Sequence, residues 1–286
     1  MELGPYRSRS LNTLLAGIGL RDTQEWQMLA SNFYSGWGEE SFEFSLEDER
    51  VDADTALEAA RQRVRSHHAY AEEQLHNSET VALKGWEYDG DKLQAKMVGS
   101  DHVTHLAYGE LEGGRDSIPL GCSALSVGVH VVTHDNMVVI ARQGAKKEGA
   151  LGFSFEQQAG MGEVKGGRVD VVGCAVRGAR EQMGLAVARG SFVFTGWGLS
   201  RAHGGCAVWG LAYLGLDWSE MWLEDERWEH QEAWAVPFRV ENVLEAMQRG
   251  VGGYGAQLGL LEALIYQYGV DTVFEAVGAK AGELAY

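Results

Sequence analysis

The feature that most constrains the fold of this chain is a glycine-rich stretch, 159–168, that runs directly into an amphipathic segment, 170–183. Asp170 is an acid at the start of this segment, where the helix dipole favours negative charge. Gly184 stands where helices commonly stop. The sequence therefore predicts a tight loop followed by a helix over Asp170–Met183.

Apolar runs on both sides of this helix predict strands. Val127–Thr133 and Met137–Arg142 are joined by His134-Asp135-Asn136, which predicts a hairpin. Further strands are predicted at Ser191–Trp197 and Cys206–Leu216, and helices near Glu241–Gln248 and Gln257–Ala276. Strands and helices mixed in this way predict an α/β domain over 117–286.

The first part of the chain has a different texture. A helix is predicted over Asp52–Leu75, and two strands at Val81–Tyr88 and Leu93–Val98 flank the turn dipeptide Asp89-Gly90. The polar, glycine-containing stretch 110–116 is a plausible boundary. We therefore expect a small α+β N-terminal domain, 1–116, before the second domain.

Composition excludes several classes of protein. The net charge of −17 disfavours general nucleic-acid binding, because such a surface repels a phosphate backbone. No apolar run approaches the roughly 20 residues that span a bilayer, so we expect no membrane partner. Cys122, Cys174 and Cys206 are far apart, which predicts neither a disulfide framework nor a cysteine zinc site. A cytoplasmic location is the simplest expectation.

The order of hairpin, glycine-rich loop, helix, strands and helix resembles the Nudix hydrolase fold. The family's box reads G-x5-E-x7-R-E-U-x-E-E-x-G-U, where U is a bulky aliphatic residue. Arg177, Glu181, Gly184 and Leu185 stand where the family has Arg, the first Glu of the Glu pair, Gly and the aliphatic residue. Around 229–237 the sequence is similar to a late family passage, and the N-terminal layout is loosely similar to the UDP-glucose-hydrolysing branch.

The resemblance implies an α/β/α sandwich with a mixed sheet that hydrolyses a nucleoside diphosphate linked to another group. It implies Mg²⁺ or Mn²⁺ held by carboxylates, with a homodimer as the favoured assembly. The residues it points to are Glu181, Glu163 and Asp170 for metal, Glu181, Glu229 and Glu232 for catalysis, and Arg142, Gly162, Trp197 and Trp209 for a phosphorylated small-molecule ligand.

Two box positions depart from the family. Gly178 replaces the first Glu and Gln182 replaces the last. A neutral amide is a poor ligand for a hard divalent ion, and glycine supplies no ligand at all. The upstream Glu is expected at Val169, so Glu163 or Asp170 could take its place only through a shift or an insertion in the loop.

These departures leave alternatives open. One is a Nudix-fold binding or regulatory protein without a metal site, and another is a pocket recruited for different chemistry in a specialised pathway. Each candidate residue also has a structural interpretation: Arg177 as an ion-pair partner, which is its usual family role, Glu229 and Glu232 as a solvated acidic loop, and the tryptophans as core.

Overall fold

The computed structural model describes residues 26–32, 34–50, 55–70, 79–89, 91–109, 123–143, 151–200, 205–221, 230–249 and 254–283. The first part of the chain contains three helical and four strand elements in this range. They are β1 (Trp26–Ser31), η1 (Glu39–Ser41), β2 (Phe42–Arg50), α2 (Thr55–Tyr70), β3 (Glu79–Tyr88), β4 (Leu93–Asp101) and α3 (His102–Gly109).

The second part begins with strands and contains the glycine-rich stretch. Its elements up to the box helix are β5 (Ser123–Val132), β6 (Met137–Gln143), β7 (Leu151–Gly152), β8 (Phe155–Gln158), η2 (Met161–Glu163), β9 (Val164–Lys165), β10 (Arg168–Val169) and α4 (Val171–Met183). The remaining elements are η3 (Arg189–Ser191), β11 (Phe192–Ser200), β12 (Cys206–Tyr213), η4 (Trp218–Glu220), β13 (His230–Pro237), α5 (Val240–Gln248), α6 (Tyr254–Tyr268) and α7 (Val270–Glu283).

In the described residues the strands form one mixed sheet. Its main path runs β1-β11-β12-β5-β3-β4-β2-β10-β9, and β6, β7, β8 and β13 branch from it through β5 and β6. The pairs β12–β5 and β2–β4 are parallel, whereas the other pairs on the main path are antiparallel. The predicted α/β class is therefore confirmed.

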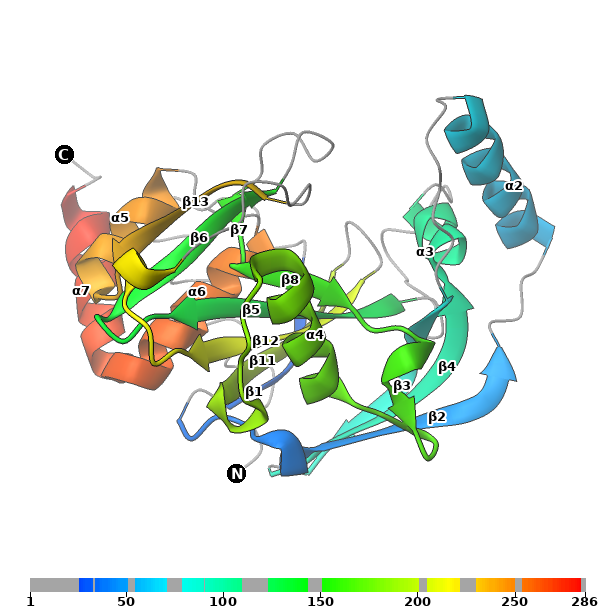
Figure 1. Cartoon of the computed structure of the whole chain (residues 1–286), viewed down its shortest axis with the longest axis horizontal. Coiled ribbons are helices and arrows are strands. Elements are labelled where there is room, and N and C mark those ends of the chain that lie inside the picture. The colour runs from blue at the N-terminus through cyan, green and yellow to red at the C-terminus, as the bar shows by residue number, and fades with distance from the viewer. Residues whose placement is uncertain are drawn as a thin grey trace.

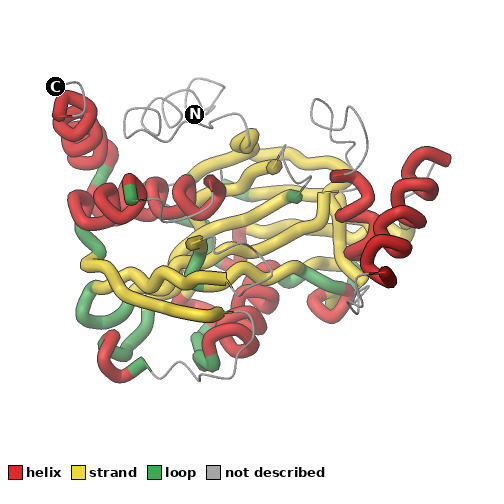
Figure 2. The backbone as a smooth tube through the Cα atoms, turned by 90° about the horizontal axis from the view of Figure 1, so that it is seen from above, coloured by secondary structure: helices red, strands yellow, loops and turns green. Residues whose placement is uncertain are grey.

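Helices cover both faces of the sheet around β5 and β12, with α4 on one face and α5, α6 and α7 on the other (Figure 1; Figure 2). The strand period of two explains these layers, because alternate side chains point to opposite faces. Val127, Val129 and Val131 pack with α4, whereas Val132 packs with α6. This arrangement agrees with the expected α/β/α sandwich.

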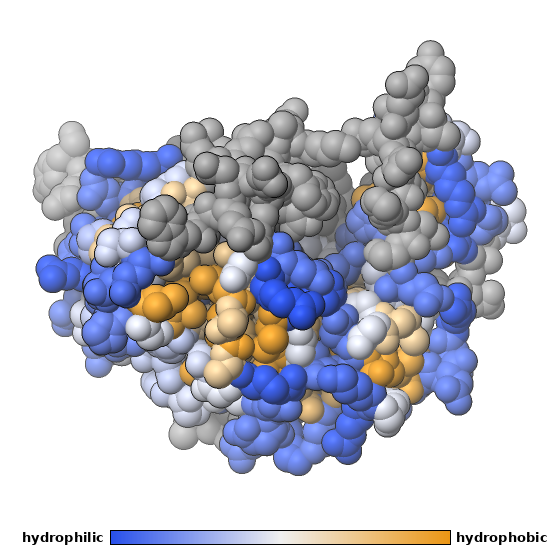
Figure 3. Space-filling model, in the orientation of Figure 1, coloured by the Kyte–Doolittle hydropathy of each residue, from blue (hydrophilic) through white to orange (hydrophobic). Residues whose placement is uncertain are grey.

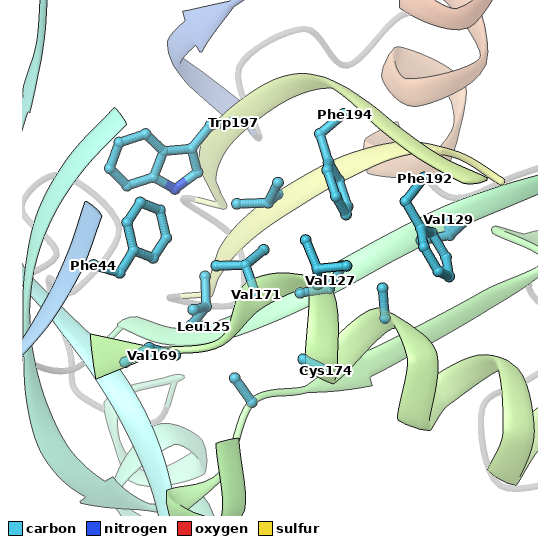
Figure 4. Close-up of a cluster of buried hydrophobic side chains, with 14 of the residues drawn as sticks. Phe44, Leu125, Val127, Val129, Val169, Val171, Cys174, Phe192, Phe194 and Trp197 are labelled. Atoms are coloured by element: carbon cyan, nitrogen blue, oxygen red, sulfur yellow. The ribbon is translucent and has the colours of Figure 1, made fainter. Parts of the chain in front are cut away.

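The core beneath α4 contains side chains from both parts of the chain. Figure 4 shows Phe44 and Trp197 facing each other, beside Leu125, Val127 and the α4 residues Val171 and Cys174. The β3–β5 contact is short, pairing Ala82 with Ala124 and Leu83 with Ser123. The predicted boundary at 110–116 lies outside the described residues, so the division at 116/117 stays a prediction.

Two expectations about elements need correction. The segment predicted as one helix, Gln257–Ala276, is two helices separated by Gly269, whose φ of 85° is in the left-handed region that favours glycine. The passage around 230–237, expected as a loop, is strand β13, which pairs antiparallel with β6. Within the described residues, no helix is long and apolar enough to cross a membrane.

Candidate functional site

The glycine-rich stretch folds into a short 3₁₀ turn, η2, followed by the β9–β10 hairpin. Gly166 and Gly167 form the turn of this hairpin with φ values of 58° and 75°, which explains two of the glycines. The hairpin occupies 164–169, between Glu163 and the start of α4. It is an insertion of six residues relative to the box spacing between Glu and Arg, the case that the sequence had left open.

Because of this insertion, Glu163 lies beside Arg177 and forms a two-oxygen ion pair with it. Arg177 Nε donates to Glu163 Oε1 at 2.6 Å, and Nη2 donates to Oε2 at 3.1 Å. The backbone N–H of Gly160 also donates to Glu163 Oε2 at 2.8 Å, and Arg177 Nη2 donates to the Gln158 carbonyl. Glu163 is only 8% exposed. The structural ion-pair interpretation of Arg177 is therefore confirmed, and Glu163 is its partner.

Asp170 is the N-cap of α4. Its Oδ1 accepts from the Gly173 N–H at 2.7 Å, as N-cap side chains commonly do. Arg189 reaches both oxygens, at 2.6 Å to Oδ1 and 3.0 Å to Oδ2, and also pairs with Glu39. Burial acts to raise the pKa of Asp170, but the hydrogen bonds from Arg189 and Gly173 outweigh it and lower the pKa to about 2.

The two departures from the box are explained by close packing of α4 on β8. A Cβ at Gly178 would lie 2.8 Å from the Gln157 Cβ and from Phe155 Cδ2, so the structure leaves no room for a side chain there. Gln182 is buried, and its Nε2 donates to the Glu156 carbonyl at 2.7 Å and to Gln157 Oε1 at 2.9 Å. Both positions therefore join the helix to the strand.

Glu181 is the predicted metal ligand with the most exposed carboxylate. Its side chain is 45% exposed, and Arg177 Nη1 donates to Oε2 at 3.1 Å. Arg180 lies 3.8 Å from its other oxygen. The outer side of α4 forms a hydrophilic area at the centre of the face in Figure 3. Glu181 is therefore near solvent but within an ionic cluster with two arginines.

Among the described contacts, none joins the other candidate residues discussed below to Glu181. Arg142 and Glu232 are backbone partners across β6 and β13, although their side chains lie outside the described set. Glu229 lies outside the described residues. Gly162 lies in η2, where a Cβ would meet no atom within 4 Å, so nothing there requires glycine.

The predicted stacking role of Trp197 and Trp209 is wrong for this structure. Both rings are fully buried, so neither has a face that a ligand can reach. Trp197 Nε1 donates to Cys206 Sγ, and Trp209 Nε1 donates to Glu262 Oε2. Cys206 is fully buried as expected, and burial raises the pKa of its thiol to about 12.

A divalent ion does not fit the residues that the box supplies here. Oxygen ligands from several carboxylates are what Mg²⁺ or Mn²⁺ needs. Asp170 and Glu163 already accept several hydrogen bonds from arginine and backbone N–H groups, so an ion would have to displace them. Among the described residues, no group of three or more His, Cys, Asp or Glu side chains is placed to hold a metal.

Two residues at notable positions, Arg189 and Glu262, are not predicted from the sequence. Arg189 follows the box, but its partner Glu39 is 150 residues away, so no local pattern could join them. Glu262 did carry a signal, because it is the single charged residue in α6 and stands within an apolar run. An acid in such a run is a candidate buried group.

Neither a protein-family model nor a curated protein matches this sequence. Among solved structures, the chain is similar to Tm1382, a candidate Nudix hydrolase, with 9% identity, a TM-score of 0.45, and coverage of 65% of this chain and 98% of that one. It is also similar to a Nudix hydrolase from Nitrosomonas europaea, with 12% identity, a TM-score of 0.35 and coverage of 49% and 87%.

A third similar structure is DR0079 from Deinococcus radiodurans, with 15% identity, a TM-score of 0.35 and coverage of 47% and 80%. The fold is Nudix-like. That description rests on this chain's own geometry: the element order that carried the resemblance, and the Glu163–Arg177 pair between the glycine-rich loop and the box helix. Activity and substrate are separate questions, because one fold serves many chemistries.

Proposed function

We propose that this chain is a Nudix-fold protein that binds a phosphorylated small molecule without a divalent ion held by its box. The observation that carries this proposal is that the acids of the box already form ion pairs and a helix cap within the protein. Glu163 is bound to Arg177, Asp170 is bound to Arg189 and caps α4, and Gly178 and Gln182 offer no carboxylate. Binding would then depend on protein cations and backbone donors rather than on metal.

A metal ion at the box would have to replace the ion pairs that the box acids already form. Drawing Glu163 toward an ion would leave Arg177 half-buried without its bidentate partner. A hydrogen bond to a charged group contributes roughly 1.5–3 kcal/mol, so breaking this pair costs the fold a comparable amount. Arg142 stays our proposed phosphate contact, because it stands near the end of β6, where the Nudix family often has a basic residue that faces the ligand.

A second candidate is metal-dependent hydrolysis of a nucleoside diphosphate linked to another group. Glu181 favours it, because its carboxylate is in register with the box and close to half-exposed. Glu229 and Glu232 stay the proposed bases for this alternative. A cytoplasmic location and a homodimer also stay predictions.

The test is a thermal-shift screen of the purified protein against nucleotide sugars and dinucleotides, with EDTA or with Mn²⁺, followed by assay for released phosphate products. Our proposal predicts a ligand that raises the melting temperature equally in EDTA and is recovered intact. Glu181→Gln should keep this shift. Metal-dependent turnover in the wild type that is lost in Glu181→Gln would replace the proposal with the hydrolytic candidate.

A further inference from the structure

Glu262 is a carboxylic acid buried in the middle of α6, on the opposite face of the sheet from the box helix. Its side chain is fully buried. It contacts β1 through Ser31 and β12 through Trp209. Gly196 of β11 lies so close that a Cβ there would collide with Glu262 and Trp209. The carboxyl group thus sits where three strands meet one helix.

Among the side chains that the structure describes, no cation faces this carboxyl group. Among the described elements, α6 packs chiefly against β5, β7, β11, β12, α5 and α7, and β1 reaches it through Ser31. β1, β5, β7, β11 and β12 contain no Lys or Arg. Besides Glu262, the described titratable side chains on α6 and these neighbours are His130, Cys206, Tyr213, Glu241, Glu245, Tyr266, Tyr268, Asp271 and Glu275.

None of these groups can neutralise a carboxylate. The imidazole in this set, that of His130, is fully buried, and burial lowers its pKa to about 3, so it is neutral. Burial raises the pKa of Tyr213 and that of the Cys206 thiol to about 12, so both groups are neutral. The acids of α5 and α7 are exposed and can only add negative charge. An isolated carboxylate in such a place would have a large desolvation cost, so the neutral acid is the stable form.

The hydrogen bonds around Glu262 accommodate that neutral form. Ser31 Oγ lies 2.5 Å from Glu262 Oε1 and 3.4 Å from the Thr195 carbonyl. A protonated Glu262 can donate to Ser31, which then donates to the Thr195 carbonyl. Trp209 Nε1 donates to Oε2 at 2.5 Å, so both carboxyl oxygens are satisfied. Ionisation would require the Ser31 hydroxyl to reorient, so that it donates to the Glu262 carboxylate and no longer to the Thr195 carbonyl.

β1 is the element that ionisation of Glu262 would affect first, because Ser31 belongs to it. It is an edge strand that pairs with β11 alone among the described strands, and its pairing is interrupted by a register shift between Met28 and Ala30. We propose that Glu262 is a proton-dependent latch: the neutral acid holds edge strand β1 against α6, and loss of its proton favours opening of β1.

The direction of the pH dependence follows from the two states of the acid. Burial raises the pKa of Glu262 to about 8, against an ordinary value of 4.5, while the Ser31 and Trp209 hydrogen bonds act in the opposite sense. The latch stabilises the closed state of β1 most below pH 4.5, where Glu262 keeps its proton in both the closed and the open state. It weakens as pH rises toward 8, because the open state releases the proton and the closed state keeps it.

The test is hydrogen exchange of β1 amides at pH 5.5, 6.5 and 7.5, with rates corrected for intrinsic exchange. The protection of β1 should fall by up to roughly tenfold per pH unit in the wild type. Glu262→Gln, whose amide can donate to Ser31 and accept from Trp209, should show protection independent of pH. Glu275→Gln, an exposed acid on α7, should behave like the wild type. Equal pH dependence in all three proteins would overturn the proposal.

A second measurement needs no variant. The carboxyl carbon of Glu262 can be followed by NMR in the wild-type protein across the same pH range. The latch requires this carboxyl group to stay protonated at pH 7. Titration near its ordinary value of 4.5 would overturn the proposal even if Glu262→Gln failed to fold.

Discussion

Gly178 shows how one residue decides what the box helix can do. In the family this position carries a glutamate, whereas here the Cβ direction is filled by Phe155 and Gln157 of β8. The absence of a carboxylate and the tight contact between α4 and β8 therefore occur at the same position. Restoring the acid would require the helix to move away from the strand.

Substitution of Gly178 by alanine tests this packing. In an open helix position, Gly to Ala stabilises by roughly 0.5–1 kcal/mol. At Gly178 the added methyl group must push against Phe155, so we expect a net loss of about 1–2 kcal/mol in urea unfolding. Gly278→Ala is the control, because a Cβ at Gly278 of α7 meets nothing within 4 Å, and it should stabilise. Stabilisation at both positions would mean that α4 is not tightly packed.

The capped helix α4 was predictable from sequence because its ends carry strong local signals. Asp170 and Gly184 mark them, and the helix spans Val171–Met183 with Gly184 in the left-handed conformation. The apolar runs also predicted β3, β4, β5 and β6. Their alternation and turn residues are local features that need no knowledge of partners.

The elements that sequence did not reveal depend on distant partners or are very short. β7, β9 and β10 have two residues each, too few for any period to appear. β13 contains one acid, Glu232, and follows an acidic run that suggests a loop; it forms a strand by pairing with β6. The sequence likewise could not decide that Glu163 pairs with Arg177, because the inserted β9–β10 hairpin sets the spacing between these two residues.

Asp170, the N-cap of α4, makes a contribution to the stability of the folded protein that depends on pH. Its pKa is about 2 in the folded protein, against an ordinary value of 3.8, so its contribution to stability is present above about pH 4 and is lost as pH falls toward 2. Asn is also a good N-cap, so Asp170→Asn removes chiefly the charge opposite Arg189. We expect the stability gap between wild type and Asp170→Asn to shrink between pH 4 and pH 2 in urea unfolding.

The control for this experiment is Asp271→Asn, which changes an exposed acid in the first turn of α7. Its difference from wild type should stay small across the range. A gap for Asp170→Asn that stayed constant with pH would show that the Arg189 pair does not stabilise the folded state.

At the scale of the whole molecule, the two parts of the chain share a sheet and a core. β1 pairs with β11, β2 pairs with β10, and Arg189 joins Glu39 to Asp170. The N-terminal elements therefore help to hold both ends of the glycine-rich region and α4. The ion pairs that use the box acids are part of this assembly, which explains why the acids cannot be freed without cost to the fold.

The most direct test of the central claim is a Mn²⁺ titration by calorimetry of the wild type and Glu181→Gln at moderate ionic strength. A chain with a net charge of −17 attracts cations weakly over its surface, so both proteins should give the same weak, non-saturating heats that diminish with added salt. A saturable site of one ion per chain in the wild type, lost in Glu181→Gln, would contradict the claim that the box holds no divalent ion.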